Sequence, residues 1–350
     1  MATAVAEGAD PDPAPGITAT TVVERLWRGE AGRAGSLLDL ALVPLELAYR
    51  AAAGTYHGAY SAGLARRSRL AVPVVSVGNV AVGGTGKTPV TRWIVGELCR
   101  RGARPAVLHG GYAPDEPALH RAWYPEVPVV VGRDRAETGA RAIEAGADVI
   151  VLDDGFQHRR LARDLDVVLV AAEDWVPRPK LLPRGPWREA PRALRRADVV
   201  AITRRTASAE SAAHVAASVE RIAPGAGIVR VHLRPAGWRV VGGDAGAPGP
   251  EGEVVAVAGV GRPRDFVANA RTAGAEIACV LVFRDHHAYG GADVRRIREA
   301  ASGRPIVTTA KDAVKLAPLA PDLDIWILEQ DVVIEAGADE LARRFDALIP

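Results

Sequence analysis

The stretch VVSVGNVAVGGTGKTP, residues 74–89, decides the fold of this chain. A β-branched run leads into a glycine-rich loop, and Gly-Lys-Thr then begins a segment with helical periodicity. Glycines let consecutive backbone N–H groups turn toward an anion, and the N-terminus of the following helix adds partial positive charge. The order strand, loop, helix therefore predicts a nucleotide-phosphate loop, or P-loop. An ordinary glycine-rich turn is the alternative, and Ala81 stands where the strict pattern has glycine.

The side chains at the end of this loop have distinct predicted tasks. The ammonium group of Lys87 would reach the β and γ phosphates of a nucleotide, and the hydroxyl of Thr88 would hold Mg²⁺. The predicted nucleotide-binding residues are Gly83, Gly84, Thr85, Gly86, Lys87 and Thr88.

Length and composition limit the class of protein. A chain of 350 residues is long enough for two domains, and 48% hydrophobic residues are enough for a core. The formal net charge of +2 gives no overall field for nucleic acid, and no obligate protein partner is indicated. Cys99 and Cys279 lie far apart, so we interpret them as small buried residues in a reducing compartment.

Between residues 71 and 234, short β-branched runs alternate with helical segments. This alternation predicts an α/β fold of the P-loop NTPase type, with a mainly parallel sheet and helices on both faces. The composition changes to glycine and proline across residues 235–252, which predicts a linker or hairpin. The alternation then starts again, so residues 253–350 are expected to form a second, smaller α/β domain.

The N-terminal region has a different character. Residues 1–35 are rich in Ala, Gly, Pro and acidic residues and lack the pattern of a secretion signal, so we expect a mobile tail with a short helix near residues 20–27. Residues 36–70 are expected to be an amphipathic helical segment. Its helix, residues 36–53, places Asp39, Glu46 and Arg50 on one face and leucines elsewhere. Three charges and a proline argue against a membrane-spanning helix. Binding to an anionic membrane surface and packing on the P-loop domain both remain open.

A buried strand that ends in two carboxylates offers a metal site. Residues 149–154 read VIVLDD, and in P-loop enzymes an acid at the end of a neighbouring strand orders Mg²⁺. Successive strand residues point to opposite faces, so one of Asp153 and Asp154 is expected to face the metal. Residues 155–160, GFQHRR, then place polar side chains at the edge where active sites of α/β sheets form.

Other charged clusters have open interpretations. On spacing alone, Asp115-Glu116-Pro117 is a solvated turn, and Arg133-Asp134-Arg135 either binds an anion or starts a helix. From Arg178 to Arg196 there are seven basic residues and one acid, Glu189, which suits a phosphorylated substrate, lipid head groups or plain solvation. The run Asp285-His286-His287 follows a strand and could orient a base.

Taken together, these motifs resemble the tetraacyldisaccharide 4′-kinases of lipid A biosynthesis. The matching pieces, in the family's order from residue 72 to about 316, are SVGNVAVGGTGKTP, DEPAL, VVVGRDR, VIVLDDGFQHRRLARDLDVVLV, LLPRGPWREAP, AGVGRPRDF, FRDHHAY and TTAKDAVKL. The family usually has Ser-Arg-Gly-Tyr-Gly-Arg and an insertion before the DEP motif, whereas residues 109–114 here read HGGYAP.

The resemblance implies a reaction and a set of roles. ATP would phosphorylate the 4′-hydroxyl of a tetraacylated glucosamine disaccharide 1-phosphate, giving lipid IVA, at the cytoplasmic face of the inner membrane as a peripheral enzyme. The implied catalytic residues are Asp115, as base or hydroxyl-orienting group, with His286 and Lys87. The implied Mg²⁺ ligands are Thr88 and Asp154, with Asp153 and Glu189 as further candidates. The implied substrate contacts are Arg188, His158, Arg135 and Glu116.

Three other functions are compatible with parts of the pattern. A P-loop GTPase of the metallochaperone type would need Asn/Thr-Lys-X-Asp, but residues 309–312 read TAKD. A kinase for another amphiphile is the second alternative. A catalytically inactive membrane-binding homologue is the third.

Overall fold

The computed structural model describes residues 22–27, 30–111, 113–243 and 245–349. Most of the predicted N-terminal tail therefore lies outside the described residues. A short helix, α1 (Val22–Trp27), lies where one was expected.

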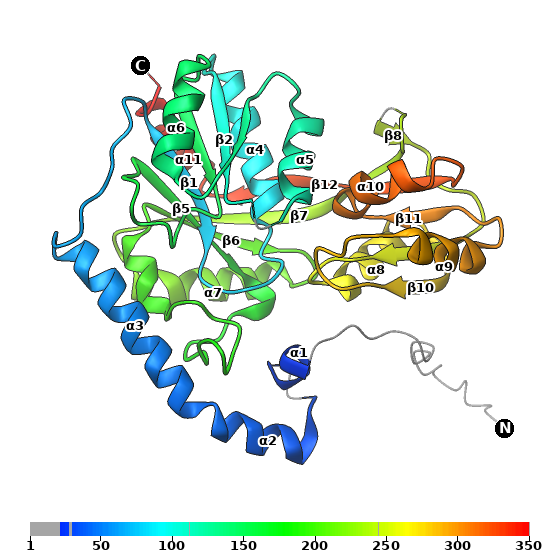
Figure 1. The fold of residues 1–350 in the computed structure, drawn as a ribbon, viewed down its shortest axis with the longest axis horizontal. Coiled ribbons are helices and arrows are strands. Elements are labelled where there is room, and N and C mark those ends of the chain that lie inside the picture. Colours follow the sequence, from blue (N-terminus) through cyan, green and yellow to red (C-terminus); the bar gives the residue numbers. More distant parts are fainter. Residues whose placement is uncertain (1–21, 28–29, 112, 244, 350) are drawn as a thin grey trace.

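One twelve-stranded sheet runs through the described part of the chain, in the order β10-β9-β11-β12-β7-β6-β5-β1-β4-β2-β3, with β8 paired to β7 (Figure 1). The strands are β1 (Val74–Asn79), β2 (Pro105–His109), β3 (Val129–Val131), β4 (Val149–Asp153), β5 (Leu165–Ala171), β6 (Val199–Arg204), β7 (Gly227–Val240), β8 (Ala245–Ala247), β9 (Glu253–Ala258), β10 (Glu276–Val282), β11 (Ile306–Thr308) and β12 (Ile325–Ala336). Every pairing except β7–β12 and β7–β8 is parallel.

Helices cover both faces of this sheet, as the alternation predicted. The helices are α2 (Gly32–Ala41), α3 (Val43–Ser61), α4 (Lys87–Arg100), α5 (Asp115–Trp123), α6 (Arg135–Glu144), α7 (Ala209–Ile222), α8 (Pro263–Thr272), α9 (Gly291–Ala301), α10 (Ala310–Leu316) and α11 (Ala338–Asp346). Apolar residues of α4 and α11 share one core cluster, and those of α7 belong to another. The predicted fold class, a mainly parallel α/β sheet of the P-loop type, is confirmed.

The strands of the two halves of the chain belong to one sheet. Strand β7 continues from Gly227 through to Val240 and pairs antiparallel with β12. A linker or hairpin was predicted at residues 235–252; within that stretch the structure has the end of β7 and a hairpin to β8. Proline is rare inside strands, so the presence of Pro235 favoured a linker over a continuing strand. It lies opposite an irregularity in the ladder, between Leu328 and Gln330.

Two short helices, α5 and α10, were not predicted from the sequence. Helix α5 begins with Asp115, Glu116 and Pro117, where a solvated turn was expected from spacing alone. Acids near a helix N-terminus interact favourably with its dipole, and proline is tolerated in the first turn. Helix α10 packs against α5, so the C-terminal half touches the P-loop half beside these acids.

The N-terminal helices present their charged face to the protein. A single helix was expected over residues 36–53, but the structure has two. The helical conformation is interrupted at Leu42, and Pro44 lies in the first turn of α3. Asp39 pairs with Lys180 and Arg184, and Glu46 accepts hydrogen bonds from Arg184 and the Leu181 amide. This contact is made to the proline- and arginine-rich loop that precedes β6.

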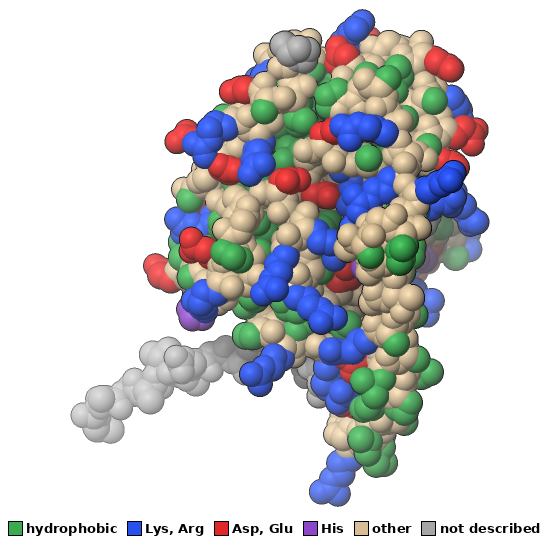
Figure 2. All heavy atoms as spheres, turned by 90° about the vertical axis from the view of Figure 1, so that its left-hand side faces the viewer, with side chains coloured by type: hydrophobic (Ala, Val, Ile, Leu, Met, Phe, Trp, Pro, Cys, Tyr) green, Lys and Arg blue, Asp and Glu red, His purple; other side chains and the backbone are tan. Residues whose placement is uncertain are grey.

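The leucines of α2 and α3 point outward. Leu37, Leu40 and Leu47 are 72%, 68% and 60% exposed. Hydrophobic side chains gather along the arm that these helices form below the body of the molecule (Figure 2). None of the described helices has both the length and the apolar character that crossing a bilayer requires.

Close packing holds Asp153, the last residue of β4, and the following Asp154 beside the P-loop. Phe156, just after them, is fully buried in the cluster on the α7 face and lies directly on Gly78 of β1. A Cβ on Gly78 would stand 2.5 Å from the Phe156 Cβ and 2.7 Å from its backbone nitrogen. The backbone after β4 therefore approaches β1 as closely as it does because residue 78 has no side chain.

We expect Gly78→Ala to lower the free energy of unfolding by about 1–3 kcal/mol, because the clash is with backbone that cannot rotate away. Gly225→Ala is the matched control, since an added Cβ there meets nothing within 4 Å. Chemical denaturation of both variants tests this. Equal midpoints for the two variants would contradict the packing argument.

Candidate functional site

The P-loop joins the carboxyl end of β1 to the first turn of α4. Its backbone is held from both sides: the Asn79 amide donates to the Thr85 hydroxyl at 2.8 Å, and Arg205 donates to the Gly84 carbonyl at 2.6 Å. Gly86 has a left-handed φ of 90°, and a Cβ there would stand 2.3 Å from a methyl carbon of Leu233. Glycine at 86 thus lets the loop turn sharply into the helix that carries Lys87 and Thr88.

The ammonium group of Lys87 lies 3.0 Å from Asp154 Oδ1. Arg188 Nη1 lies 3.1 Å from the other oxygen of the same carboxylate and also donates to Gln157 Oε1. Asp154 itself has a left-handed φ of 58°, unusual for a residue with a side chain and frequent at functional sites. Two cations thus converge on Asp154 next to the phosphate loop.

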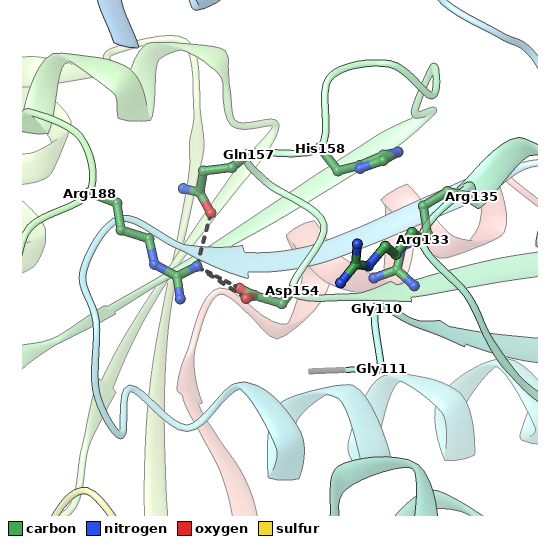
Figure 3. A pocket seen from close by; sticks show the side chains of 8 residues that line it. All are labelled: Gly110, Gly111, Arg133, Arg135, Asp154, Gln157, His158 and Arg188. Atoms are coloured by element: carbon green, nitrogen blue, oxygen red, sulfur yellow. Dashed lines mark hydrogen bonds and ion pairs between the residues drawn. The ribbon is translucent and has the colours of Figure 1, made fainter. Parts of the chain in front are cut away.

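A basic cleft of about 380 Å³ opens beside this pair (Figure 3). It is lined by Gly110, Gly111, Arg133, Arg135, Asp154, Gln157, His158 and Arg188. Three predicted substrate residues, Arg135, His158 and Arg188, therefore come together here. Burial lowers the pKa of His158, and the neighbouring Arg135 lowers it further, so its imidazole is neutral at pH 7. Arg133 and Gln157 were not chosen as site residues, although both lie in motifs that the sequence analysis quoted.

A second group of buried side chains surrounds Glu116. One of its oxygens accepts a hydrogen bond from the Thr88 hydroxyl at 3.3 Å and lies 2.6 Å from the Lys311 ammonium. The other lies 3.0 Å from His109 Nε2. Burial acts to raise the pKa of Glu116, but the His109 hydrogen bond and the Lys311 charge outweigh burial and hold that pKa well below its usual range. The resemblance implied Glu116 as a substrate contact; in the structure its carboxylate contacts the Thr88 hydroxyl of the P-loop.

Asp153, the first acid of the pair, faces the same group. Its carboxylate contacts the Thr91 hydroxyl at 3.3 Å and His120 Nε2 at 2.9 Å. Potential ligand atoms of His109, Glu116 and Asp153 lie within 4.8 Å of one another. Carboxylate and hydroxyl oxygens are the donors that Mg²⁺ prefers, so the oxygens of Thr88, Glu116 and Asp153 suit that ion.

Asp115 and His286 meet across the two halves of the chain. His286 Nδ1 lies 3.0 and 3.1 Å from the two Asp115 oxygens, and the Lys315 ammonium lies 3.5 Å from one of them. Burial acts to raise the pKa of Asp115, but the His286 hydrogen bond, with Lys311 and Lys315, holds it below its usual value. The Asp115 hydrogen bond in turn raises the pKa of His286. The resemblance implied both residues as catalytic, and the structure brings their side chains into contact.

Glu189, which the resemblance implied as a further candidate Mg²⁺ ligand, pairs with other groups in this structure. Its carboxylate lies 2.9 Å from Arg196 and 3.2 Å from His57, and it accepts a hydrogen bond from Gln157. These partners make it part of an ion-pair cluster between α3 and the loop before β6. The sequence could not show this, because His57 lies on a helix more than a hundred residues earlier.

Asp312 does not resemble a guanine-reading residue. It accepts hydrogen bonds from the Gly259 amide, the Tyr289 hydroxyl and the Thr309 hydroxyl, and it is fully buried. The GTPase alternative, which already lacked the required spacing, gains no support from this environment.

Comparison with known proteins gives a consistent result. A family model described as Tetraacyldisaccharide-1-P 4′-kinase (LpxK) matches residues 38–114 and 113–349. A tetraacyldisaccharide 4′-kinase of Anaeromyxobacter sp. (strain Fw109-5) is 39% identical over 94% of this chain and 97% of the relative. Another, of Halorhodospira halophila, is 37% identical over 85% of this chain and 90% of the relative.

A solved structure is also similar. LpxK from Aquifex aeolicus, crystallised in complex with ATP, superimposes with a TM-score of 0.71 at 26% identity, covering 89% of this chain and all of that one. With motifs, fold and relatives in agreement, the chain belongs to the tetraacyldisaccharide-1-phosphate 4′-kinase family.

Proposed function

We propose that this chain transfers the γ-phosphate of ATP to the 4′-hydroxyl of a tetraacyldisaccharide 1-phosphate, with Mg²⁺, at the cytoplasmic face of the inner membrane. The observation that carries the proposal is the 3.0 Å contact between Asp115 and His286. Asp115 is followed on α5 by Glu116, which contacts the Thr88 hydroxyl of the P-loop. A hydroxyl-orienting group and a phosphate site thus stand side by side.

The phosphate loop supplies positioning and charge. Loop amides and Lys87 would bind the β and γ phosphates, which requires the Lys87 ammonium to leave Asp154. Mg²⁺ would be held by Thr88, Glu116 and Asp153, with Asp154 nearby, and when bound it neutralises charge on the phosphates. Glu116, which the resemblance implied as a substrate contact, would thus be a metal ligand.

Asp115 would accept a hydrogen bond from the sugar hydroxyl and take its proton as the oxygen–phosphorus bond forms and ADP leaves. Its lowered pKa makes it a weak base, so its main contribution is to align the hydroxyl. His286, with its raised pKa, donates to Asp115 and keeps the carboxylate turned toward the site.

The basic cleft suits the acceptor. Its arginines, Arg133, Arg135 and Arg188, match the negative charge of a phosphorylated disaccharide. Gly110, one of the lining residues, stands where the family pattern has its first arginine, so the cleft has no side chain at that position.

The outward leucines of α2 and α3 suit the membrane on which such an acylated substrate resides. The charged residues Asp39 and Glu46 are used in contacts with the body, which leaves an apolar face uncovered. The exposed arginines Arg66 and Arg67 lie just beyond α3 and would favour anionic head groups. Packing and membrane binding are therefore compatible, because the charged face of these helices contacts the body of the protein and the apolar face would contact the membrane.

Incubation of the purified protein with γ-labelled ATP and a lipid A disaccharide 1-phosphate should place label on the lipid. Asp115→Asn should lower kcat by roughly 100-fold or more, with the KM for ATP nearly unchanged, because the hydroxyl loses its orienting carboxylate. Asp331→Asn is the control, since Asp331 forms an exposed ion pair with Arg234. No transfer by the wild type would refute the function, and full turnover by Asp115→Asn would exclude that residue.

His286 should stabilise the protein most at low pH. Its folded pKa is raised above the unfolded value of about 6.5, so the charged pair with Asp115 is fully formed below that pH and is lost as pH rises through the folded pKa. His286→Asn tolerates the left-handed φ of 56° at this position. Urea midpoints at pH 6 and pH 9 should show a wild-type advantage that shrinks at pH 9. An advantage that grows with pH would contradict the pairing.

Replacing Leu37, Leu40 and Leu47 together by Glu should reduce flotation of the protein with anionic lipid vesicles, because the exposed apolar face becomes charged. Leu319→Glu, at an exposed leucine of the C-terminal half, is the control. If the triple variant floats as well as the wild type, this face does not bind the membrane.

A further inference from the structure

Lys311 of α10 stands at the phosphate site although it comes from the other end of the chain. Its ammonium lies 2.6 Å from the Glu116 oxygen that also accepts the Thr88 hydroxyl hydrogen bond. The Lys311 ammonium and the Thr88 hydroxyl therefore contact the same carboxylate oxygen, and no more than two hydrogen-bond lengths separate them. Its side chain is 23% exposed, so a ligand entering the loop can reach it.

The groups around Lys311 keep it charged. Burial acts to lower its pKa, but the Glu116 carboxylate, followed by Asp285 and Asp115, outweighs burial and raises it. His286 also lies near enough for the Lys311 charge to act on its pKa. The ammonium therefore lies between the pair that would orient the acceptor hydroxyl and the loop that would hold the donor phosphate.

The surrounding loops of the C-terminal half also cover the P-loop. A Cβ on Gly261 would stand 3.3 Å from the Gly84 amide nitrogen, and one on Gly84 would stand 3.4 Å from Arg262 side-chain carbons. Arg262 pairs with Asp174 of the P-loop half. This loop lies against the P-loop, and helix α10 lies against α5, so two segments of the C-terminal half border the predicted phosphate site.

We propose that Lys311 is a further catalytic residue of this reaction, which contacts the γ-phosphoryl group and stabilises its charge during transfer. This inference rests on the proposed function. A phosphate bound between Thr88 and Asp115 would replace the Glu116 carboxylate as the anionic partner of Lys311. A positive charge at this position acts on the transition state, in which charge is spread over the phosphoryl oxygens.

The competing explanation is that Lys311 does no more than neutralise Glu116. Lys315, one turn further along α10, provides the matched control: its ammonium lies 3.5 Å from both Asp115 and Asp312, and it pairs with those residues and not with Glu116. Loss of a contact to the γ-phosphate weakens ATP binding selectively, whereas loss of a structural ion pair affects ATP and ADP alike.

The experiment measures the affinities of the full chain for ATP and for ADP by calorimetry in the presence of Mg²⁺. Lys311→Met should weaken ATP binding by about 10-fold or more and leave ADP binding within about twofold. It should also lower kcat by at least about 100-fold. Lys315→Met should keep the wild-type ratio of the two affinities. An unchanged ratio in Lys311→Met would overturn the proposal.

One further comparison keeps the test decisive. Should Lys311→Met fail to fold, Glu116→Gln/Lys311→Met removes both charges and is compared with Glu116→Gln by the same criterion. The affinity ratio needs no lipid, so it separates this inference from the proposed function. Absence of lipid phosphorylation by the wild type would refute the function, whereas the ratio alone decides whether Lys311 reads the γ-phosphate.

Discussion

The antiparallel pairing of β7 with β12 is the constraint on which the rest of the structure depends. It joins a P-loop sheet and a smaller α/β sheet into one continuous surface, with the loop after β10 and helix α10 facing the P-loop half. Without this pairing, Asp115 and Glu116 would lack the partners His286 and Lys311, which follow them by more than 150 residues. The site is therefore a product of the whole sheet and not of the P-loop half alone.

The four acids at this edge are each compensated by a basic group. Asp154 is paired with Lys87 and Arg188, Asp153 with His120, Glu116 with His109 and Lys311, and Asp115 with His286 and Lys315. Buried carboxylates without such partners would be strongly unfavourable. The lysines and the arginine among these partners are the kind of cation that binds a triphosphate. On this account, nucleotide binding is an exchange of anionic partners within a preformed charge network.

Local sequence patterns were enough to predict the P-loop, the strand ending in Asp153-Asp154 and the alternating fold, because each depends on a short contiguous segment. The extent of β7 was not predictable, since a proline inside a strand is acceptable here through an irregular register that the partner strand supplies. The ion pairs of Glu189 were not predictable, because its partner His57 comes from α3. Lys311 was missed for the same reason: its partner, Glu116, lies in the other half of the chain.

The most direct test of the account is a crystal structure of the full chain with magnesium and a non-hydrolysable ATP analogue. The account predicts the triphosphate in the turn formed by residues 83–88, with the Lys87 ammonium moved from Asp154 to the β and γ phosphates. An analogue bound elsewhere, with the Lys87–Asp154 contact intact, would contradict it.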